Sequence, residues 1–437
     1  MRQYTIFEKI PIFSRVLLHM PSFLRTSSKN RREIEKKQLR KLQKILLHAY
    51  RDVPFYREKF NKHRLNPQKI RSIRDFQKYV PFTTKDEILE NYPLFFPREQ
   101  QLKKMILSHS SGSSGKFLKI YHKPINTYPY ILGRYRNFRT ITDYGPFTKV
   151  FYIYTSLYPA QSVFGLYRFY FTETLNDIDD TKAGILKVKP HILNLYPSHL
   201  AELAKVFRRP EIRELSLRCI LVGSEMSSQS QRDELGKIFN CPVYDEYSSE
   251  ELGWISSQCK HKTYHCFEDL NFLEVIDESG EVLTAGKPGE IVGTNLCNTV
   301  MPFIRYKQGD RASLHLETCP CGSNFLVMKN LVGRKNQSLV IHERTFSSGY
   351  LLDLCYNIIL KLKAQVLDFC LFQKIDGQII LELILKEENK AEIPKIRDYF
   401  YQHLNTPCEV KIVDVLTKTK TGKRNPIFSL IPPTAHD

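Results

Sequence analysis

The segment Ser110–Lys116 consists of six small residues, all serine or glycine, and a final lysine. Small residues let backbone N–H groups and hydroxyls approach an anion closely, and the lysine adds positive charge. The segment is not a Walker P-loop, because that pattern needs a glycine at position 110 and Ser or Thr at position 117, where this chain has Ser110 and Phe117. Since such a run is also typical of a flexible loop, it predicts phosphate binding only together with other parts of a nucleotide site.

Three later motifs could supply those parts. Tyr247 provides an aromatic ring that can stack on a base, and Glu250, three residues on, provides a carboxylate that can hold Mg²⁺ against phosphate oxygens. Asp310 follows a glycine, in what we expect to be a turn, and its carboxylate could accept hydrogen bonds from ribose hydroxyls. Arg334 follows a second glycine at a predicted domain border. Each motif is weak alone, so the argument depends on their order and spacing.

A second kind of chemistry is indicated by soft and borderline metal ligands. The Cys-Pro-Cys-Gly sequence at 319–322 is a tight chelating turn, and a Cys-x5-His pair lies upstream. Such a set can complete a tetrahedral, structural zinc site. The predicted ligands are Cys259, His265, Cys319 and Cys321. His261 and Cys266 lie close enough in the sequence to compete, and isolated thiols beside a hydrogen-bonded histidine are the alternative.

The elements that must position these residues follow an α/β pattern. Short apolar runs alternate with helical patterns between residues 100 and 300, which predicts a sheet with helices on its faces. The runs in question are Lys149–Tyr154, Ser198–Phe207, Cys219–Val222, Ser228–Phe239 and Pro242–Tyr244. Upstream, residues 30–50 have apolar positions at helical spacing and predict a basic amphipathic helix.

The pattern changes towards the C-terminus. Residues 270–330 predict a β-rich subdomain, with strands at Phe272–Ile276, Gly289–Asn295 and Ala312–Leu316. Beyond residue 334 we expect a small α+β domain. Its predicted elements are strands Asp368–Gln373 and Gln378–Leu385 across an Asp-Gly turn, a helix near Lys390–Leu404 and a strand Glu409–Val415.

Charge is strongly asymmetric along the chain. The 437 residues carry a net charge of +19, and residues 1–60 hold 15 Lys and Arg against 5 Asp and Glu. A basic segment suits phosphates, a lipid surface or nucleic acid, although a solvated basic helix is the simpler interpretation.

The apolar stretch Tyr4–Leu24 is interrupted by charges and prolines, so it predicts neither a membrane span nor a signal peptide. A helix that lies on a membrane surface is the alternative that this stretch leaves open. Ten cysteines without a secretion signal favour a reducing cytoplasm.

The order of the motifs resembles the adenylate-forming superfamily of acyl- and aryl-CoA synthetases. Within it, the chain is most similar to the phenylacetate–CoA ligase branch and its relatives in capsular polysaccharide biosynthesis. Ser110–Lys116 resembles the family's phosphate loop, Tyr247–Glu250 its Tyr-Gly-x-Thr-Glu motif, and Ile304–Asp310 its Arg-Tyr-x-x-Gly-Asp motif. The segments His48–Tyr56 and Pro81–Lys85 resemble the N-terminal signature of this branch. The resemblance covers about residues 35–425.

This resemblance implies roles for individual residues. Lys423, in a Thr- and Lys-rich loop, would stabilise charge as a carboxylate attacks the α-phosphate, and Glu250 would hold Mg²⁺. Tyr247 would stack on adenine and Asp310 would bind the ribose. The residues implied in nucleotide binding are Ser110, Gly112, Ser113, Ser114, Gly115, Lys116, Gly223, Ser224, Glu225, Asp245, Glu246, Tyr247, Ser248, Ser249, Asp310 and Arg334. For Asp245 and Glu246, ordinary strand-end polarity is the alternative. Lys335 stands where the family usually places a hinge Asp.

The resemblance also implies an organisation and an activity. We expect a basic segment 1–34, an AMP-binding domain 35–334 and a mobile α+β lid 335–437. The implied activity is ATP- and Mg²⁺-dependent formation of an acyl-adenylate, followed by transfer of the acyl group to CoA or another acceptor.

The alternative is an adenylyltransferase or ligase that acts on a sugar or amine in cell-surface polysaccharide synthesis. Its basic N-terminus would then contact a membrane surface or a glycan-lipid. A nucleic-acid-binding function is not expected, because no basic–aromatic RNA motif or DNA-reading zinc finger is present.

Overall fold

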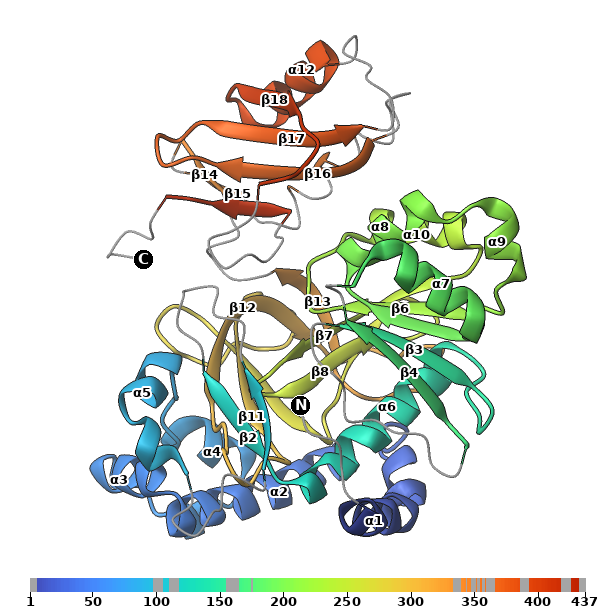
Figure 1. The fold of residues 1–437 in the computed structure, drawn as a ribbon. Coiled ribbons are helices and arrows are strands. Elements are labelled where there is room, and N and C mark those ends of the chain that lie inside the picture. The colour runs from blue at the N-terminus through green and yellow to red at the C-terminus, as the bar shows by residue number, and fades with distance from the viewer. Residues whose placement is uncertain are drawn as a thin grey trace. The chain divides into compact units, whose positions relative to one another are not determined.

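The protein has a mixed α/β fold, as predicted, which we describe from a computed structural model (Figure 1). The described residues are 6–96, 105–109, 118–154, 165–173, 176–332, 339–342, 344–346, 351, 354–355, 358, 366–385, 393–417 and 426–431. The chain forms two compact units. Unit 1 comprises Met1–Thr148, Thr155–Phe171 and Tyr244–Asn330, and unit 2 comprises Lys149–Tyr154, Thr172–Val243 and Leu331–Asp437.

Helices form the N-terminal part of unit 1. They are α1 (Ile6–Leu24), α2 (Arg31–Asp52), α3 (Pro54–Lys62), α4 (Ile73–Tyr79), α5 (Lys85–Glu90) and α6 (Tyr128–Ile141), with short 3-10 turns at Pro67–Lys69, Tyr92–Phe95 and Pro124–Thr127. The helix predicted over residues 30–50 is confirmed as α2. It begins where the Asn30 side chain accepts a hydrogen bond from the Glu33 N–H, and it ends at Asp52, just before Pro54 starts α3.

Antiparallel strands form the rest of unit 1. β1 (Ile106–His109) pairs with β2 (Lys119–His122) in a separate two-stranded sheet. The larger sheet contains β7 (Val243–Ser249), β8 (Gly253–Gln258), β9 (Tyr264–Cys266), β10 (Asn271–Ile276), β11 (Gly289–Asn295), β12 (Tyr306–His315) and β13 (Val327–Val332). Their order is β10-β11-β12-β13-β9-β8-β7. The strands predicted within residues 270–330 are therefore confirmed, and their sheet extends back to β7.

Two of the predicted strands are longer than the sequence indicated. The strand expected at Ala312–Leu316 begins at Tyr306, and the one expected at Pro242–Tyr244 continues to Ser249. The turn that we expected before Asp310 is wrong, because Gly309 lies inside β12 with a φ of +76°. A glycine tolerates this left-handed conformation, so the strand continues through it.

Unit 2 begins with parallel strands that are almost entirely buried. β3 (Lys149–Tyr154), β5 (Ile192–Leu195) and β6 (Cys219–Gly223) lie side by side in the order β6-β5-β3, as near-continuous apolar runs favour. The helices of this part are α7 (Ile178–Val188), α8 (Pro197–Val206), α9 (Arg209–Glu214) and α10 (Gln229–Phe239). The strand β4 (Arg168–Glu173) crosses the border between the two units. The strand and helix runs predicted between residues 149 and 239 are confirmed.

The C-terminal part of unit 2 is a small α+β structure, as predicted. Its described elements include the helix α12 (Ile393–Leu404) and the strands β14 (Leu339–Ile341), β15 (Arg344–Phe346), β16 (Val366–Gln373), β17 (Ile379–Leu385), β18 (Cys408–Ile412) and β19 (Ile427–Ser429). The four-stranded sheet has the order β18-β17-β16-β19. Gly377, with a φ of +85°, makes the predicted turn between β16 and β17. Leu371, Leu381 and Phe400 belong to the buried core between sheet and helix.

Within the part of the chain that the structure describes, no helix combines the length and apolar character needed to cross a bilayer.

Candidate functional site

Two predicted nucleotide-binding residues from distant positions meet in unit 1. The Tyr247 hydroxyl in β7 donates a hydrogen bond to Oδ2 of Asp310 in β12, at 2.6 Å. Three strands lie between β7 and β12 in the sheet order. Because neighbouring strands are ~4.8 Å apart, a flat sheet would separate the two by ~19 Å. The sheet of unit 1 must therefore curl, and its curvature brings the two motifs together.

Irregularities in the strands accompany both residues. In β12, the pairing with β11 shifts register between Glu290 and Val292, opposite the stretch that contains Gly309 and Asp310. In β7, the pairing with β8 shifts immediately after Tyr247. A bulge bends a strand and changes the direction of its side chains, which is why bulges recur beside active sites. These local irregularities give Tyr247 and Asp310 the directions that let them meet.

Glu250 lies in the turn after β7, and its side chain is exposed. The residues on either side of Glu250 are held in place by hydrogen bonds. The Ser249 hydroxyl accepts a hydrogen bond from the Leu252 N–H, and Glu251 accepts one from the Tyr306 hydroxyl at 3.1 Å. The half-buried Ser248 precedes this turn as part of β7. An exposed carboxylate on an anchored turn has the oxygen donors that suit Mg²⁺.

Asp245 and Glu246 lie within β7 and are buried, so the strand-end interpretation of both is wrong. The Tyr264 hydroxyl donates to Oδ2 of Asp245 at 2.5 Å. Burial raises the pKa of Glu246 to about 7, against the opposing charge of Arg134. Among the described residues, Oε2 of Glu246 has no hydrogen-bond partner. Glu246 is therefore a protonatable group within the core of unit 1.

The predicted segment Gly223–Glu225 lies in unit 2, directly at the end of β6. Ser224 has a φ of +66°, a left-handed conformation that is uncommon outside glycine. Glu225 accepts a hydrogen bond from the Ser198 N–H at the start of α8, at 3.1 Å. This contact ties the residue to the N-terminus of a helix, where a negative charge is favoured.

The other residues predicted from the family resemblance lie outside the described residues. These are Ser110, Gly112, Ser113, Ser114, Gly115 and Lys116 of the phosphate loop, Arg334 at the predicted hinge, and Lys423 of the lysine loop.

The Arg-Tyr pair before Gly309 is held by a buried network of hydrogen bonds. Arg305 donates two hydrogen bonds to the carboxylate of Glu274, at 3.1 and 2.9 Å, and a third to the Val80 carbonyl at 2.7 Å. Arg305 and Glu274 are 3% and 2% exposed. The guanidinium also stacks on Phe82, 4.0 Å from the ring centre. A buried, bidentate ion pair of this kind fixes the position of Arg305, the residue directly before β12.

The N-terminal signature segments contact the same strand. Thr83 donates its N–H to the Arg305 carbonyl and accepts from the Lys307 N–H, which forms a short bridge beside Tyr306. The Tyr56 hydroxyl accepts a hydrogen bond from the Ile304 N–H at 3.1 Å. Both signature segments therefore support the strand that carries Asp310.

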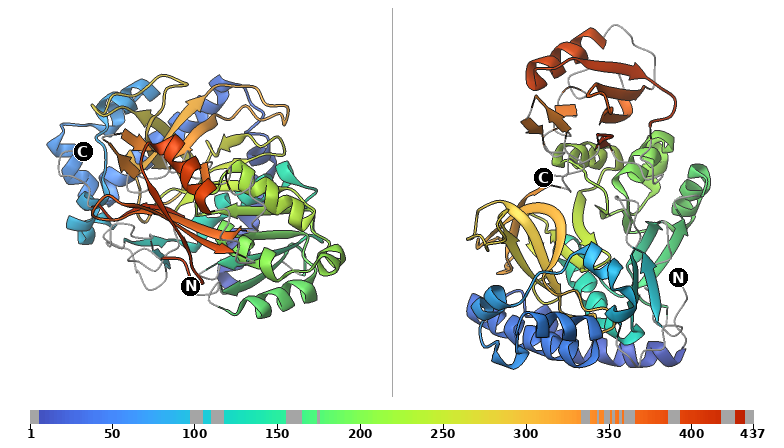
Figure 2. Two further views of the ribbon diagram at one scale, coloured as in Figure 1. Left: turned by 90° about the horizontal axis from the view of Figure 1, so that it is seen from above. Right: turned by 90° about the vertical axis from the view of Figure 1, so that its left-hand side faces the viewer.

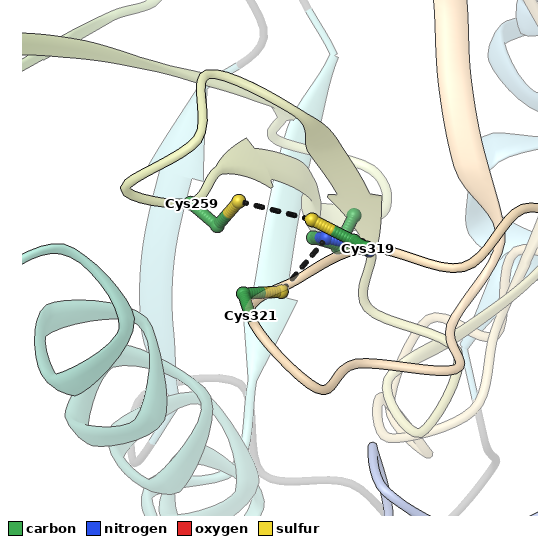
Figure 3. Close-up of side chains that lie close together, drawn as sticks. Cys259, Cys319 and Cys321 are labelled. Carbon is green, nitrogen blue, oxygen red and sulfur yellow. Dashed lines mark hydrogen bonds between the residues drawn. The ribbon is translucent and has the colours of Figure 1, made fainter.

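The cysteine–histidine set forms one cluster. The ligand atoms of Cys259, His265, Cys319 and Cys321 all lie within 4.8 Å of one another. Figure 3 shows the sulfurs of the three cysteines directed toward a common centre. The Sγ atoms of Cys259 and Cys319 are 3.7 Å apart, and Sγ of Cys321 lies 3.2 Å from Nε2 of His265.

Strand pairing explains how these ligands meet. Cys259 follows the end of β8, His265 lies in β9, and the Cys319–Gly322 turn precedes β13, the other neighbour of β9. Gly322 closes that turn with a φ of +83° and donates its N–H to the Cys319 carbonyl. Cys266 follows His265 in the same strand, so its side chain points to the opposite face. Among the described residues, neither Cys266 nor His261 belongs to the group that could hold a metal ion.

We compared the chain with known proteins in sequence and in fold. No protein-family model matches the chain. The chain is 27% identical to phenylacetate-coenzyme A ligase of Thermus thermophilus over 335 residues, which cover 71% of this chain and 72% of that protein. The chain is similar to phenylacetate–CoA ligases of the adenylate-forming family in sequence, and to a CoA ligase in fold. It is thus an adenylate-forming ligase, as the resemblance implied.

Two further comparisons concern the whole length of this phenylacetate–CoA ligase-like chain. It is 24% identical to Protein CapK of Staphylococcus aureus over 399 residues, which cover 85% of this chain and 83% of that protein. Its fold matches the crystal structure of 2-hydroxyisobutyryl-CoA ligase with a TM-score of 0.79 and 16% identity, over 94% of this chain and 92% of that one. That structure holds its enzyme in the postadenylation state with a bound acyl-AMP.

Sequence reasoning missed several residues of the phenylacetate–CoA ligase-like site. Glu274, Thr83 and Tyr56 contact residues 304–307 at the start of β12, yet none of them was assigned a role. A signal existed for Glu274 only, as a carboxylate inside an apolar strand pattern, which needs a buried cation as its partner. The hydrogen bonds of Thr83 and Tyr56 depend on contacts across more than 200 positions and leave no local pattern.

Proposed function

We propose that this enzyme activates a carboxylic acid with ATP as an acyl-adenylate and then transfers the acyl group to CoA. A carboxylate oxygen attacks the α-phosphorus of ATP, and the bond to the β-phosphate breaks with release of pyrophosphate. The CoA thiol then attacks the acyl carbonyl, loses its proton, and AMP leaves. The observation that carries the proposal is the 2.6 Å contact between Tyr247 and Asp310, because it joins two nucleotide-site motifs in a phenylacetate–CoA ligase-like chain.

Each named residue would have one task in this proposal. The ring of Tyr247 would stack on adenine, and the Asp310 carboxylate would accept hydrogen bonds from the ribose. The Glu250 carboxylate would hold Mg²⁺, which when bound offsets negative charge on the phosphate oxygens. Lys423 would balance charge at the α-phosphate during the first half-reaction. Residues 335–437 would act as a lid that brings Lys423 to the site for that step only.

The test is ATP–pyrophosphate exchange with a panel of aryl and short aliphatic acids. Wild-type enzyme should support exchange with at least one acid. Lys423→Ala should lower the exchange rate by about 100-fold or more, because it removes a charge used in the transition state. Lys420→Ala is the matched control, since it removes a lysine from the same loop. If no acid supports exchange, or both variants keep the wild-type rate, the proposal is wrong.

A second candidate function is supported by the relation to CapK, which covers more of this chain than the relation to the Thermus ligase does. The acceptor would then be a sugar hydroxyl or an amine used in cell-surface polysaccharide synthesis. Product analysis separates the two. A thioester of CoA supports the first proposal, whereas AMP or an acyl group attached to a sugar or amine supports the second.

We also propose that the cysteine–histidine cluster holds a structural Zn²⁺. Two thiolates, each 2.3 Å from a tetrahedral zinc, would lie ~3.8 Å apart, and Cys259 and Cys319 are 3.7 Å apart. Four protein ligands would complete the coordination and leave no position for a substrate, so the zinc would join the Cys319–Gly322 turn to the β8–β9 hairpin.

A further inference from the structure

Helix α1 has two different apolar faces. Ile12, Val16 and Phe23 are buried and join a core cluster in unit 1 with Leu132 and Trp254. This inner face therefore packs on α6 and on the sheet. At 100° per residue, Ile12, Val16 and Phe23 fall within a narrow sector of the helix, as expected for a docked face.

The opposite face is apolar too, but exposed. Phe7 is 82% exposed, Ile10 58%, Leu17 54% and Leu18 74%. Their spacing places all four on the side of α1 that lies opposite Val16. Among the described residues, no other helix or strand carries more than one exposed large apolar side chain. Isolated exposed apolar residues are ordinary, but a stripe of four on one helix face marks an interaction surface.

The charge around this stripe is positive. Between positions 6 and 52, which contain α1 and α2, the chain has 12 Lys and Arg against 4 Asp and Glu. Exposed cations follow one side of α2 at four-residue intervals, namely Arg32, Lys36, Arg40 and Lys44. Figures 1 and 2 show α1 and α2 at the same end of unit 1.

We propose that α1 docks the enzyme on the surface of an anionic lipid bilayer. The exposed stripe would enter the boundary between head groups and acyl chains, and the cations of α2 would bind the anionic head groups. The charge distribution favours an anionic bilayer as the binding partner. Exposed cations beside an apolar stripe complement a membrane that has anionic head groups and an apolar interior. The helix carries too little apolar length to cross the bilayer, so it would lie on it. The proposal is independent of the acyl acceptor.

The experiment is flotation of the full-length chain with vesicles. Wild-type protein should float with phosphatidylcholine vesicles that contain about one third phosphatidylglycerol, and about tenfold less with phosphatidylcholine alone or in high salt. The double variant Phe7→Ser/Leu18→Ser should bind the anionic vesicles at least about tenfold more weakly, because it removes two inserted side chains. Phe147→Ser is the matched control, since Phe147 is 75% exposed elsewhere in unit 1, and it should float like wild type.

Charge is tested separately. The triple variant Arg32→Gln/Lys36→Gln/Arg40→Gln should lose most of the salt-sensitive binding, whereas Arg209→Gln/Arg213→Gln, which removes exposed cations from α9, should keep it. Circular dichroism of each variant verifies that it is folded. If wild type floats with neither vesicle, or if the double variant floats as wild type does, the proposal is overturned. A wild-type dimer that the double variant dissociates, without flotation, would instead identify α1 as a contact between two copies of the chain.

Discussion

At the scale of single residues, the Tyr247–Asp310 hydrogen bond makes the proposed nucleotide site testable. A phenol that donates to a carboxylate at 2.6 Å fixes the orientation of that carboxylate. The contribution of each residue can therefore be separated, because the ring and the hydroxyl of Tyr247 have different tasks.

Asp310→Ala should raise the Kd for AMP by about 10- to 100-fold, since hydrogen bonds to a charged group contribute about 1.5–3 kcal/mol. Tyr247→Phe keeps the stacking ring and loses only the contact that orients Asp310, so its Kd should rise by about threefold or less. Tyr247→Ala should resemble Asp310→Ala. Isothermal titration calorimetry measures all three. Equal affinity of Asp310→Ala and wild type would place the ribose elsewhere.

Glu246 should make stability depend on pH. Burial raises its pKa from 4.5 to about 7, so between these values the folded chain holds a proton that the unfolded chain has released. The free energy of unfolding therefore falls as the pH rises through this window, by on the order of 3 kcal/mol from this group. Glu246→Gln removes the effect. The variant should gain stability relative to wild type between pH 4.5 and 7, measured by urea unfolding followed by circular dichroism.

Glu211→Gln is the control for this prediction. Hydrogen bonds from Arg208 and Lys182 lower the pKa of Glu211 to about 2. Its carboxylate is therefore charged in both states above pH 5, and the stability difference between this variant and wild type should be constant from pH 5 to 8. If the Glu246→Gln difference is equally constant, the assigned titration of Glu246 is wrong.

At the scale of elements, the entry to β12 depends on the Arg305–Glu274 pair. Arg305→Met leaves a charged Glu274 buried without its cation, which should lower the free energy of unfolding by about 3–5 kcal/mol. The double variant Arg305→Met/Glu274→Met removes both charges and should recover much of this loss. Chemical unfolding of the two single variants and the double variant measures the coupling. A simple sum of the single effects would show that the pair does not act as a unit.

The cysteine–histidine cluster brings the β8–β9 hairpin and the Cys319–Gly322 turn together, and the zinc that we propose for it should be measurable directly. We expect about one zinc per chain in purified protein and substoichiometric zinc in Cys321→Ser, because zinc needs all four ligands of a closed site. The thermal midpoint should fall in Cys321→Ser and in wild type treated with a strong chelator. Cys297→Ser, which changes a cysteine outside the cluster, should keep its metal. Equal metal content in the two variants would exclude the site.

Sequence reasoning succeeded where a local pattern determines structure. The strand predicted at Gly289–Asn295 has the observed bounds, because a short apolar run between turn residues specifies a buried strand. The four residues of the cluster were grouped from residue type and spacing, and they lie close together, whereas the zinc that they would hold stays a prediction. By contrast, Gly309 resembled a turn, since a glycine before an aspartate has the same local pattern in a turn and in a bulge. Only the pairing of β12 with β11 separates the two.

At the scale of the whole molecule, α1 should tolerate change on one face only. Ile12→Ser places a hydroxyl in the core and should lower the free energy of unfolding by about 2–5 kcal/mol. Phe7→Ser changes an exposed side chain and should shift it by about 0.5 kcal/mol or less. Calorimetric melting of both variants without lipid measures this. Equal losses would show that the outer face of α1 also supports the fold.

The single tryptophan of the chain, Trp254, gives unit 1 its own optical signal. Its indole ring packs 5.8 Å from Phe267, with the Arg134 guanidinium 4.3 Å from its centre, so its emission changes when that core opens. Unit 2 has no tryptophan, and its helices and strands contribute to circular dichroism alone. A melt followed by indole fluorescence therefore reports unit 1, and a second transition seen only by circular dichroism would reveal that unit 2 unfolds on its own.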